Sequence, residues 1–268
     1  YPLRRQRQMC IRDRGGAGGP LAVLFVAIAT SEIGKLAAGE TKVDILVTPL
    51  VTIGVGATLA ALCAPPLGKL AMQTGTVIMW ATELQPFLMG ILVSVFVGIA
   101  LTLPISSAAI CAALGLTGLA GGAAVAGCSA QMIGFAVQSY RENGVGGLLS
   151  QGLGTSMLQM PNIVRNPRIW IGPIFASAIT GPLATCVFKL RMDGAAVSSG
   201  MGTCGLVGQI GVFTGWISDM AAGTKAAITS FDWLGLLFIS FVLPAILSPI
   251  INQGCCRLGW VKNGDMKL

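Results

Sequence analysis

Two short segments place polar side chains within apolar stretches and could therefore bind a polar solute. Residues 151–159 read QGLGTSMLQ and residues 200–209 read GMGTCGLVGQ, so each has a Gly-x-Gly-Thr sequence followed by a glutamine. The glycine-broken stretches that contain them, 145–160 and 197–217, are too short or too irregular to cross a bilayer comfortably. Irregular backbone at membrane depth must be buried in protein or line an aqueous cavity, and interrupted helices can hold substrates near the bilayer midplane. We predict a ligand cavity at these segments; the alternative is that the glycines serve only helix packing.

Amide and hydroxyl side chains are the candidate substrate-binding groups. Both kinds of group donate and accept hydrogen bonds, which suits a polyhydroxylated ligand. In and around the two segments these residues are Gln151, Thr155, Gln159, Asn162, Thr203 and Gln209, and two further candidates are Gln131 and Asn143. Gln131 lies in a run that is otherwise small and apolar, so an amide that bridges two helices is the competing interpretation.

Glu142 and Glu83 are the candidate catalytic residues. An ionisable group near membrane depth is a functional hypothesis by default. Glu142 lies between Arg141 and Asn143, and a solvated turn is the alternative for it. The chain has no histidine, which removes the usual general base and the histidine dyads of nucleophilic catalysis.

Neither a metal nor another cofactor is expected. The chain has 8 cysteines, none of them in a C-x-x-C pair, and without histidine a Cys/His zinc site is excluded. Most of these cysteines lie in apolar runs, where they behave as small hydrophobic residues. A nucleotide-binding loop of the G-x-x-x-x-G-K-[ST] type is also missing, so this chain alone is not expected to use ATP.

Composition places the chain in a membrane. Of its 268 residues, 54% are hydrophobic and only 10% are charged, whereas soluble domains carry about 25% charged residues. The mean hydropathy is +0.79. The sequence therefore predicts an all-α polytopic integral membrane protein with about seven to nine transmembrane or re-entrant segments, at about 20 residues per crossing. Part of the formal net charge of +7 comes from the basic residues in 1–14, so no nucleic-acid partner is expected.

The lengths of the apolar runs predict individual segments. Spans are expected at 17–34, 43–64, 86–103, 169–189 and 231–251. Pro65 and Pro66 are expected to end the second span, because proline removes a backbone donor. Residues 67–85 mix polar and apolar side chains and predict an interfacial helix. The region 105–139 is too long for one upright helix, and its glycines at 115–122 are expected to divide it.

The chain is expected to form one transmembrane domain over residues 15–268. Residues 1–14 are basic, have no apolar core and do not resemble a signal peptide; we predict that they are foreign or disordered and that the domain is truncated at its N-terminus. Arg257, Lys262 and Lys267 follow the last span, and basic residues beside spans favour the cytoplasm. The C-terminus is therefore predicted to be cytoplasmic.

Long contiguous strings resemble a known family. They are residues 84–163, which begin LQPFLMG and end LQMPNI, together with GPLAT at 181–185 and GMGTCGLVGQIG at 200–211. These strings resemble the membrane subunit IIC of bacterial sugar phosphotransferase systems, in the divergent branch that includes perfringolysin O regulator-like proteins. The resemblance runs from about Gly19 to Leu268.

The resemblance implies a sugar permease in the bacterial cytoplasmic membrane. Such a subunit translocates a sugar for phosphorylation by a separate IIB protein, which receives its phosphate through a IIA protein, and it carries no phosphoryl-carrier site of its own. The resemblance also implies a homodimer surrounded by lipid, re-entrant hairpins around the sugar, and a Glu, often with a His, at the sugar hydroxyl. Since histidine is missing here, two alternatives stay open: a non-transporting membrane sensor or regulator, and a facilitator of a small polar solute.

Overall fold

The computed structural model describes residues 19–37, 44–103, 106–223, 227–262 and 264–268. These residues form helices joined by turns and contain no strand, only one isolated bridge between Gly118 and Met192. The predicted all-α fold class is confirmed. The segment 1–14, predicted to be foreign, lies outside the described residues.

The chain divides into two compact units, Tyr1–Gly75 with Ala112–Leu114 and Thr76–Cys111 with Gly115–Leu268. The first unit contains α2 (Gly19–Ala37) and the greater part of α3 (Asp44–Leu84). Small side chains pack these two helices together, since a Cβ on Gly34 would lie 2.5 Å from Thr52 Cγ2. The second unit contains all the candidate site residues named above.

The predicted end of a helix at Pro65 and Pro66 is wrong. Helix α3 continues through both prolines and extends to Leu84, so it also contains most of the segment 67–85 that was predicted to be interfacial. Proline weakens a helix because it lacks the N–H group. Membrane helices nevertheless tolerate proline, since neighbouring groups satisfy the carbonyl oxygens that it leaves free.

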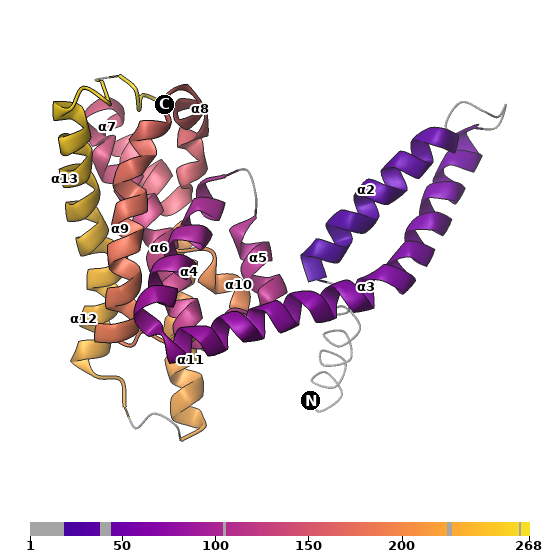
Figure 1. The fold of residues 1–268 in the computed structure, drawn as a ribbon, viewed down its shortest axis with the longest axis horizontal. Coiled ribbons are helices and arrows are strands. Elements are labelled where there is room, and N and C mark those ends of the chain that lie inside the picture. The colour runs from indigo at the N-terminus through magenta and orange to yellow at the C-terminus, as the bar shows by residue number, and fades with distance from the viewer. Residues whose placement is uncertain (1–18, 38–43, 104–105, 224–226, 263) are drawn as a thin grey trace. The chain divides into compact units, whose positions relative to one another are not determined.

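Four helices form the core of the second unit: α4 (Pro86–Thr102), α6 (Gly118–Gln138), α9 (Ile171–Pro182) and α13 (Leu243–Arg257). They run side by side in Figure 1, with α6 in contact with the other three. Because α6 is rich in glycine and alanine, neighbouring backbones approach it closely. A Cβ on Gly127 would clash with the main-chain carbonyl of Ser94 in α4.

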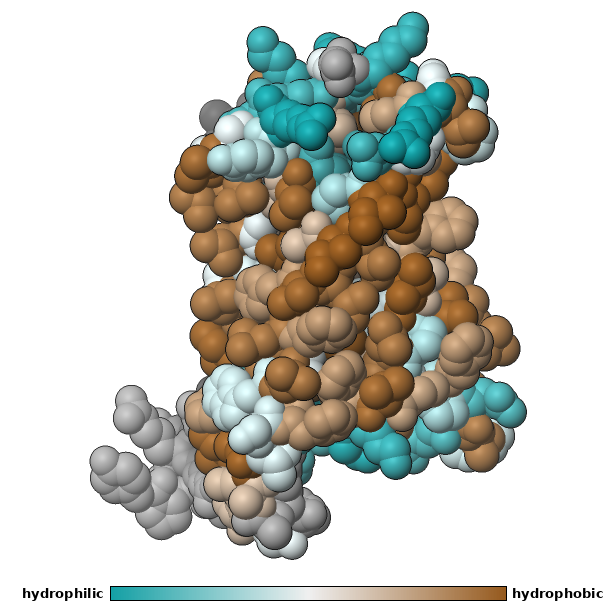
Figure 2. Space-filling model, turned by 90° about the vertical axis from the view of Figure 1, so that its left-hand side faces the viewer, coloured by the Kyte–Doolittle hydropathy of each residue, from teal (hydrophilic) through white to brown (hydrophobic). Residues whose placement is uncertain are grey.

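The dimensions and surface of this unit suit a bilayer. Helix α6 has 21 residues, so it is about 31 Å long at 1.5 Å per residue, close to the thickness of the hydrocarbon core. Helical segments at Gly118–Gln138, Pro167–Val187 and Ser230–Arg257 are long and apolar enough to cross a membrane, and a shorter apolar helix covers Pro86–Thr102. In the first unit, a shorter apolar helix covers Val47–Cys63. Figure 2 shows a broad band of apolar side chains between two polar ends.

The predicted break within residues 105–139 is confirmed. Helix α5 (Ser107–Leu114) ends before Gly115, and α6 begins at Gly118. Both glycines have positive φ, 64° and 62°, a conformation that glycine adopts without steric cost. The division separates the short α5 from α6, which is a candidate membrane span.

Both Gly-x-Gly-Thr segments interrupt their helices, as predicted. After α7 (Tyr140–Leu149) the chain forms a π-helical turn, Ser150–Gly154, a 3₁₀ turn, Ser156–Gln159, and the short α8 (Met160–Arg165). In the second segment, α10 (Ala196–Ser199), turns and a 3₁₀ turn, Cys204–Leu206, precede α11 (Val207–Ala221). The chain then continues into α12 (Ser230–Leu237), which leads through a π-helical turn into α13.

The close contact at Gly127 predicts a stability effect. Gly127→Ala should lower the free energy of unfolding by about 1–3 kcal/mol, because the new methyl group overpacks against the backbone of α4. The measurement is the midpoint of thermal unfolding in detergent, followed by tryptophan fluorescence. Gly146→Ala in α7 is the matched control, since a Cβ there meets nothing within 4 Å. Equal midpoints for the two variants would contradict the prediction.

Candidate ligand site

The structure brings the two interrupted segments together. The hydroxyl of Thr203, in the second segment, donates a hydrogen bond of 2.6 Å to the main-chain carbonyl of Gly152 in the first. The second segment also packs on the middle of α6: Gly202, with φ 53°, has space for no side chain because a Cβ would lie 2.6 Å from Cys128 Cβ. Gln209 Nε2 donates to Ser129 Oγ at 3.3 Å. The interruptions are therefore held beside the centre of a membrane-spanning helix.

A pocket of about 350 Å³ lies at this junction. Its lining includes Leu101, Ser107, Gly154, Thr155, Met201 and Cys204, so both segments contribute. Within the described residues, the Thr155 hydroxyl accepts a hydrogen bond from the amide of Met157 at 3.2 Å and can still donate one. Ser107 Oγ donates to the carbonyl of Gly200 at 2.7 Å, which ties α5 to the second segment. The pocket is mainly apolar, with a few polar atoms at its wall.

Gln131 is fully buried and bridges helices, which is the competing interpretation of the sequence. Its Oε1 accepts hydrogen bonds from Trp170 Nε1 at 2.8 Å and from Thr102 Oγ1 at 3.3 Å, and its Nε2 donates to Ser177 Oγ at 3.3 Å. Thr102 in turn shares a hydrogen bond of 2.9 Å with Ser156 of the first interrupted segment. The amide thus links α4, α6 and α9 to the junction, and a role in substrate binding stays a prediction.

Two other predicted amides are buried with an oxygen left over. Gln151 Nε2 donates to Ser139 Oγ at 2.9 Å and to the carbonyl of Gly147 at 3.1 Å, but Gln151 Oε1 has no partner among the described residues. The same is true of Gln209 Oε1. An unsatisfied buried acceptor costs about 1–3 kcal/mol, so each oxygen is suited to a ligand hydroxyl or an ordered water. Neither residue lines the 350 Å³ pocket.

Four of the remaining predicted polar residues, Glu142, Asn143, Gln159 and Asn162, hold the C-terminal segment 264–268. Glu142 accepts hydrogen bonds from the amides of Gly264 and Met266, both at 2.9 Å. Three side-chain amides bind the main chain of the same segment. Asn143 Nδ2 and Gln159 Nε2 donate to the carbonyl of Met266 at 2.8 and 3.0 Å, and Asn162 Nδ2 donates to the carbonyl of Lys267 at 3.0 Å. Asn143 Oδ1 also accepts a hydrogen bond from the amide of Leu268 at 2.8 Å. These residues therefore form one polar cluster at an end of the bundle, away from the 350 Å³ pocket.

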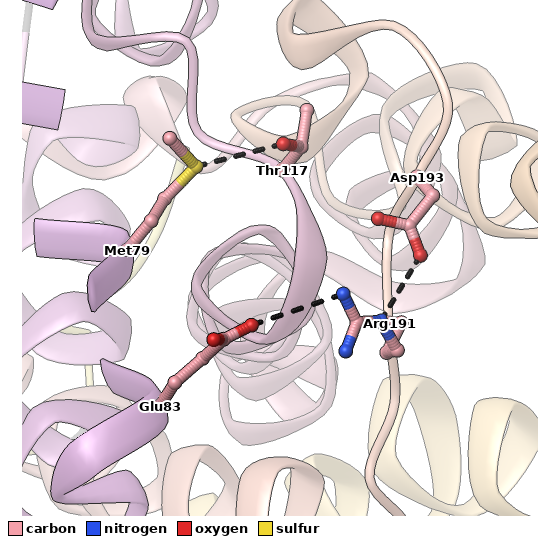
Figure 3. A network of polar contacts seen from close by, with 5 residues as sticks. All are labelled: Met79, Glu83, Thr117, Arg191 and Asp193. Carbon is pink, nitrogen blue, oxygen red and sulfur yellow. Dashed lines mark hydrogen bonds and ion pairs between the residues drawn. The ribbon is translucent and has the colours of Figure 1, made fainter. Parts of the chain in front are cut away.

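Glu83 does not join Glu142. As Figure 3 shows, the Glu83 carboxylate faces Arg191, at 3.9 Å, and Arg191 Nε donates to Asp193 at 3.2 Å. The Glu83 side chain is 59% exposed. Nearby, Thr117 Oγ1 donates to Met79 Sδ at 3.5 Å. This group lies where α3 ends and α6 begins, whereas Glu142 follows the opposite end of α6.

Sequence reasoning missed the polar residues that face the core from α4, from α9 and from the 3₁₀ turn Pro167–Trp170 before α9. Thr102, Trp170 and Ser177 were not candidates, although they surround Gln131. Each stands among apolar residues with no distinguishing motif, so only their convergence on one amide reveals them. Within the described ranges, no group of three His, Cys, Asp or Glu side chains could hold a metal ion.

The fold and the junction define a class of protein: a helical membrane protein whose interrupted segments meet inside the bundle, as in permeases. Residues 7–268 match the family described as "Phosphotransferase system, EIIC", and the chain belongs to that family. It is a permease-type membrane subunit of a sugar phosphotransferase system. No curated protein and no solved structure matches the chain.

The contacts of Glu142 predict that this carboxylate holds segment 264–268 in place. Glu142→Gln should raise amide hydrogen exchange at residues 264–268 about tenfold, because hydrogen bonds to a charged acceptor contribute roughly 1.5–3 kcal/mol and the amide group accepts with one oxygen only. Exchange is measured by mass spectrometry on the intact protein in nanodiscs. Glu83→Gln is the matched control and should leave this segment unchanged. Unaltered exchange in the Glu142 variant would show that the carboxylate does not hold the segment.

Proposed function

We propose that this chain carries a sugar across the cytoplasmic membrane of a bacterium. A separate soluble IIB protein, supplied by a IIA protein, would phosphorylate the sugar on the inner side. One observation carries the proposal: the Thr203–Gly152 hydrogen bond of 2.6 Å joins the two interrupted segments beside the middle of α6. Membership of the EIIC family supports the same conclusion.

The pocket at the junction is the proposed sugar site. Its volume of about 350 Å³ lies at the lower end of the range for small-molecule pockets, about 300–1,000 Å³. Thr155 would contribute a hydroxyl, the interrupted backbone would contribute free peptide groups, and the apolar wall would contact the C–H faces of a sugar ring. The unpaired oxygens of Gln151 and Gln209 would accept sugar hydroxyls if the segments shift during transport.

The distribution of charge supports one orientation of the second unit in the membrane. The basic residues near the C-terminal segment are Arg141, Arg165, Arg168, Arg257, Lys262 and Lys267. The carboxylates at this end are Glu142 and Asp265. The other end has Lys189 and Arg191 with the carboxylates Glu83 and Asp193, so among these residues cations outnumber carboxylates only near the C-terminal segment. Basic residues beside membrane spans favour the cytoplasm. We therefore propose that the C-terminal segment is cytoplasmic.

This orientation favours Glu142 over Glu83 as the catalytic carboxylate. A IIB protein acts from the cytoplasm, where Glu142 lies in the proposed topology, whereas Glu83 would face the other side. Glu142 would accept the proton of the sugar hydroxyl that attacks the phosphate. Its two oxygens each accept one backbone N–H, from Gly264 and Met266. A carboxylate has about four lone-pair sites, so each oxygen keeps the capacity to accept that proton.

A second function, a non-transporting sensor or a facilitator, is favoured by a different observation. No acidic side chain lines the 350 Å³ pocket among the described residues, and the chain has no histidine. Such a pocket can bind a sugar without activating its hydroxyl. Uptake that depends on a phosphorylated IIB protein would support transport, whereas sugar binding without uptake would support the sensor.

The pocket predicts which variant loses sugar affinity. Thr155→Val should weaken binding several-fold, since one hydrogen bond contributes about 0.5–1.5 kcal/mol. Binding is measured by thermal shift in nanodiscs, first across hexoses, hexitols and disaccharides with the unmodified protein, and then by titration of the best ligand. Thr214→Val is the matched control, because its hydroxyl donates only to the Gly211 carbonyl of its own helix among the described residues. Equal affinities of the two variants would exclude this pocket, and the absence of any ligand would favour a regulator.

The proposed orientation predicts the outcome of a fusion experiment. Green fluorescent protein joined after Leu268 should fluoresce in bacterial cells, because it folds in the cytoplasm. Alkaline phosphatase at the same position should be inactive, because it is active only on the outer side of the cytoplasmic membrane. An active phosphatase fusion would show that the orientation is opposite to the proposed one.

Native mass spectrometry of the purified chain tests the homodimer that the family resemblance implies.

A further inference from the structure

A second cavity, of about 730 Å³, lies at the end of the bundle that holds segment 264–268. It is open to solvent on one side and is bordered by the last turn of α6, the start of α7, the last turns of α13 and the loop that follows. Its polar lining includes Gln138, Arg141, Glu142, Asn252, Arg257 and Lys262. Helix α13 completes a candidate membrane span at Arg257, so the cavity lies where lipid headgroups meet the protein.

The charge of this cavity is positive. Arg141, Arg257 and Lys262 form no ion pair with any residue that the structure describes. Glu142 is the one carboxylate in the described lining. Its oxygens already accept two backbone N–H groups, which offset part of its charge. Three cationic side chains from α7, α13 and the loop are thus left to face an anion.

Asn252, which lines the cavity, has an unused hydrogen-bond acceptor. Asn252 is only 7% exposed, and its Oδ1 has no partner among the described residues. In contrast, Gln138 is satisfied, since its Nε2 donates to the carbonyl of Ile169 at 3.0 Å and its Oε1 accepts from Ser248 at 3.0 Å. A buried amide oxygen without a donor is suited to a hydroxyl group of a ligand.

We infer that this cavity binds a phosphate ester that carries hydroxyl groups. The phosphate oxygens would pair with Arg141, Arg257 and Lys262, and a hydroxyl would donate to Asn252 Oδ1. Two sources have this chemistry: the headgroup of an anionic phospholipid such as phosphatidylglycerol, and a soluble polyol phosphate such as glycerol 3-phosphate. Basic pockets between membrane helices on the cytoplasmic side commonly take lipid headgroups. The inference does not depend on the proposed sugar site.

Binding to the purified, delipidated full chain tests this inference. The probes are phosphatidylglycerol, phosphatidylcholine and glycerol 3-phosphate, with native mass spectrometry for the lipids and thermal shift for the soluble ester. We expect phosphatidylglycerol to bind more tightly than the zwitterionic phosphatidylcholine. Binding of phosphatidylglycerol alone assigns the cavity to a lipid headgroup, and binding of glycerol 3-phosphate assigns it to a soluble ester as well. Equal binding of the two lipids, with no binding of glycerol 3-phosphate, would overturn the inference.

Two double variants, each of which removes two cations, distinguish binding in the cavity from attraction to the general positive charge of the surface. The double variant Arg257→Gln/Lys262→Gln should bind the preferred probe about tenfold more weakly or worse. Arg165→Gln/Arg168→Gln removes two cations at the same end but outside the cavity lining, and its affinity should stay within about twofold of that of the unmodified chain. Equal losses in both variants would overturn the site. Unfolding midpoints without any probe confirm that each variant is folded, and Arg141→Gln replaces the double variant if it is not.

Discussion

The structure of the second unit depends on the close approach of other backbones to helix α6. Gly127 permits α4 to touch α6 at Ser94, and Gly202 lets the second interrupted segment lie directly on Cys128. In a bilayer the hydrophobic effect does not drive helices together, so packing and interhelical hydrogen bonds must do so. A methyl group at either glycine would separate the backbones and weaken both the packing and the hydrogen bonds between these elements. The small side chains of α6 allow the second interrupted segment to pack against its backbone, and hydrogen bonds such as that of Thr203 to Gly152 hold the two segments together.

Close packing also makes the polar groups of the core possible. Gln131 is excluded from solvent, yet Thr102, Trp170 and Ser177 satisfy both ends of its amide. A buried amide without partners would cost several kcal/mol in hydrocarbon. Because an unpaired buried acceptor is costly, the oxygens of Gln151, Gln209 and Asn252 that have no partner among the described residues stand out against the fully bonded Gln131. A ligand hydroxyl or an ordered water would supply the missing hydrogen-bond donor at those positions.

The two ends of the unit differ in their charged and polar contacts. At one end, the polar cluster around Glu142 holds the main chain of segment 264–268 and borders a cationic cavity. At the other, Glu83 and Arg191 are exposed and close to each other. The proposed sugar pocket lies between the two ends. A single conformation therefore separates the pocket from the carboxylate that would act on its ligand, and a change of conformation must connect them if transport is coupled to phosphorylation.

The sequence by itself determined the membrane class, the break before α6 and the two glycine interruptions, because hydropathy and glycine conformation are local properties. Local reasoning failed at Pro65 and Pro66, where a helix continues through two prolines. Only the tertiary structure decided which polar residues meet. Glu142 binds an amide 122 residues later in the chain, and no pattern within a short window encodes such a contact. Side chains of the same type thus became helix bridges, holders of a terminal segment or neighbours of a pocket, according to what long-range packing placed beside them.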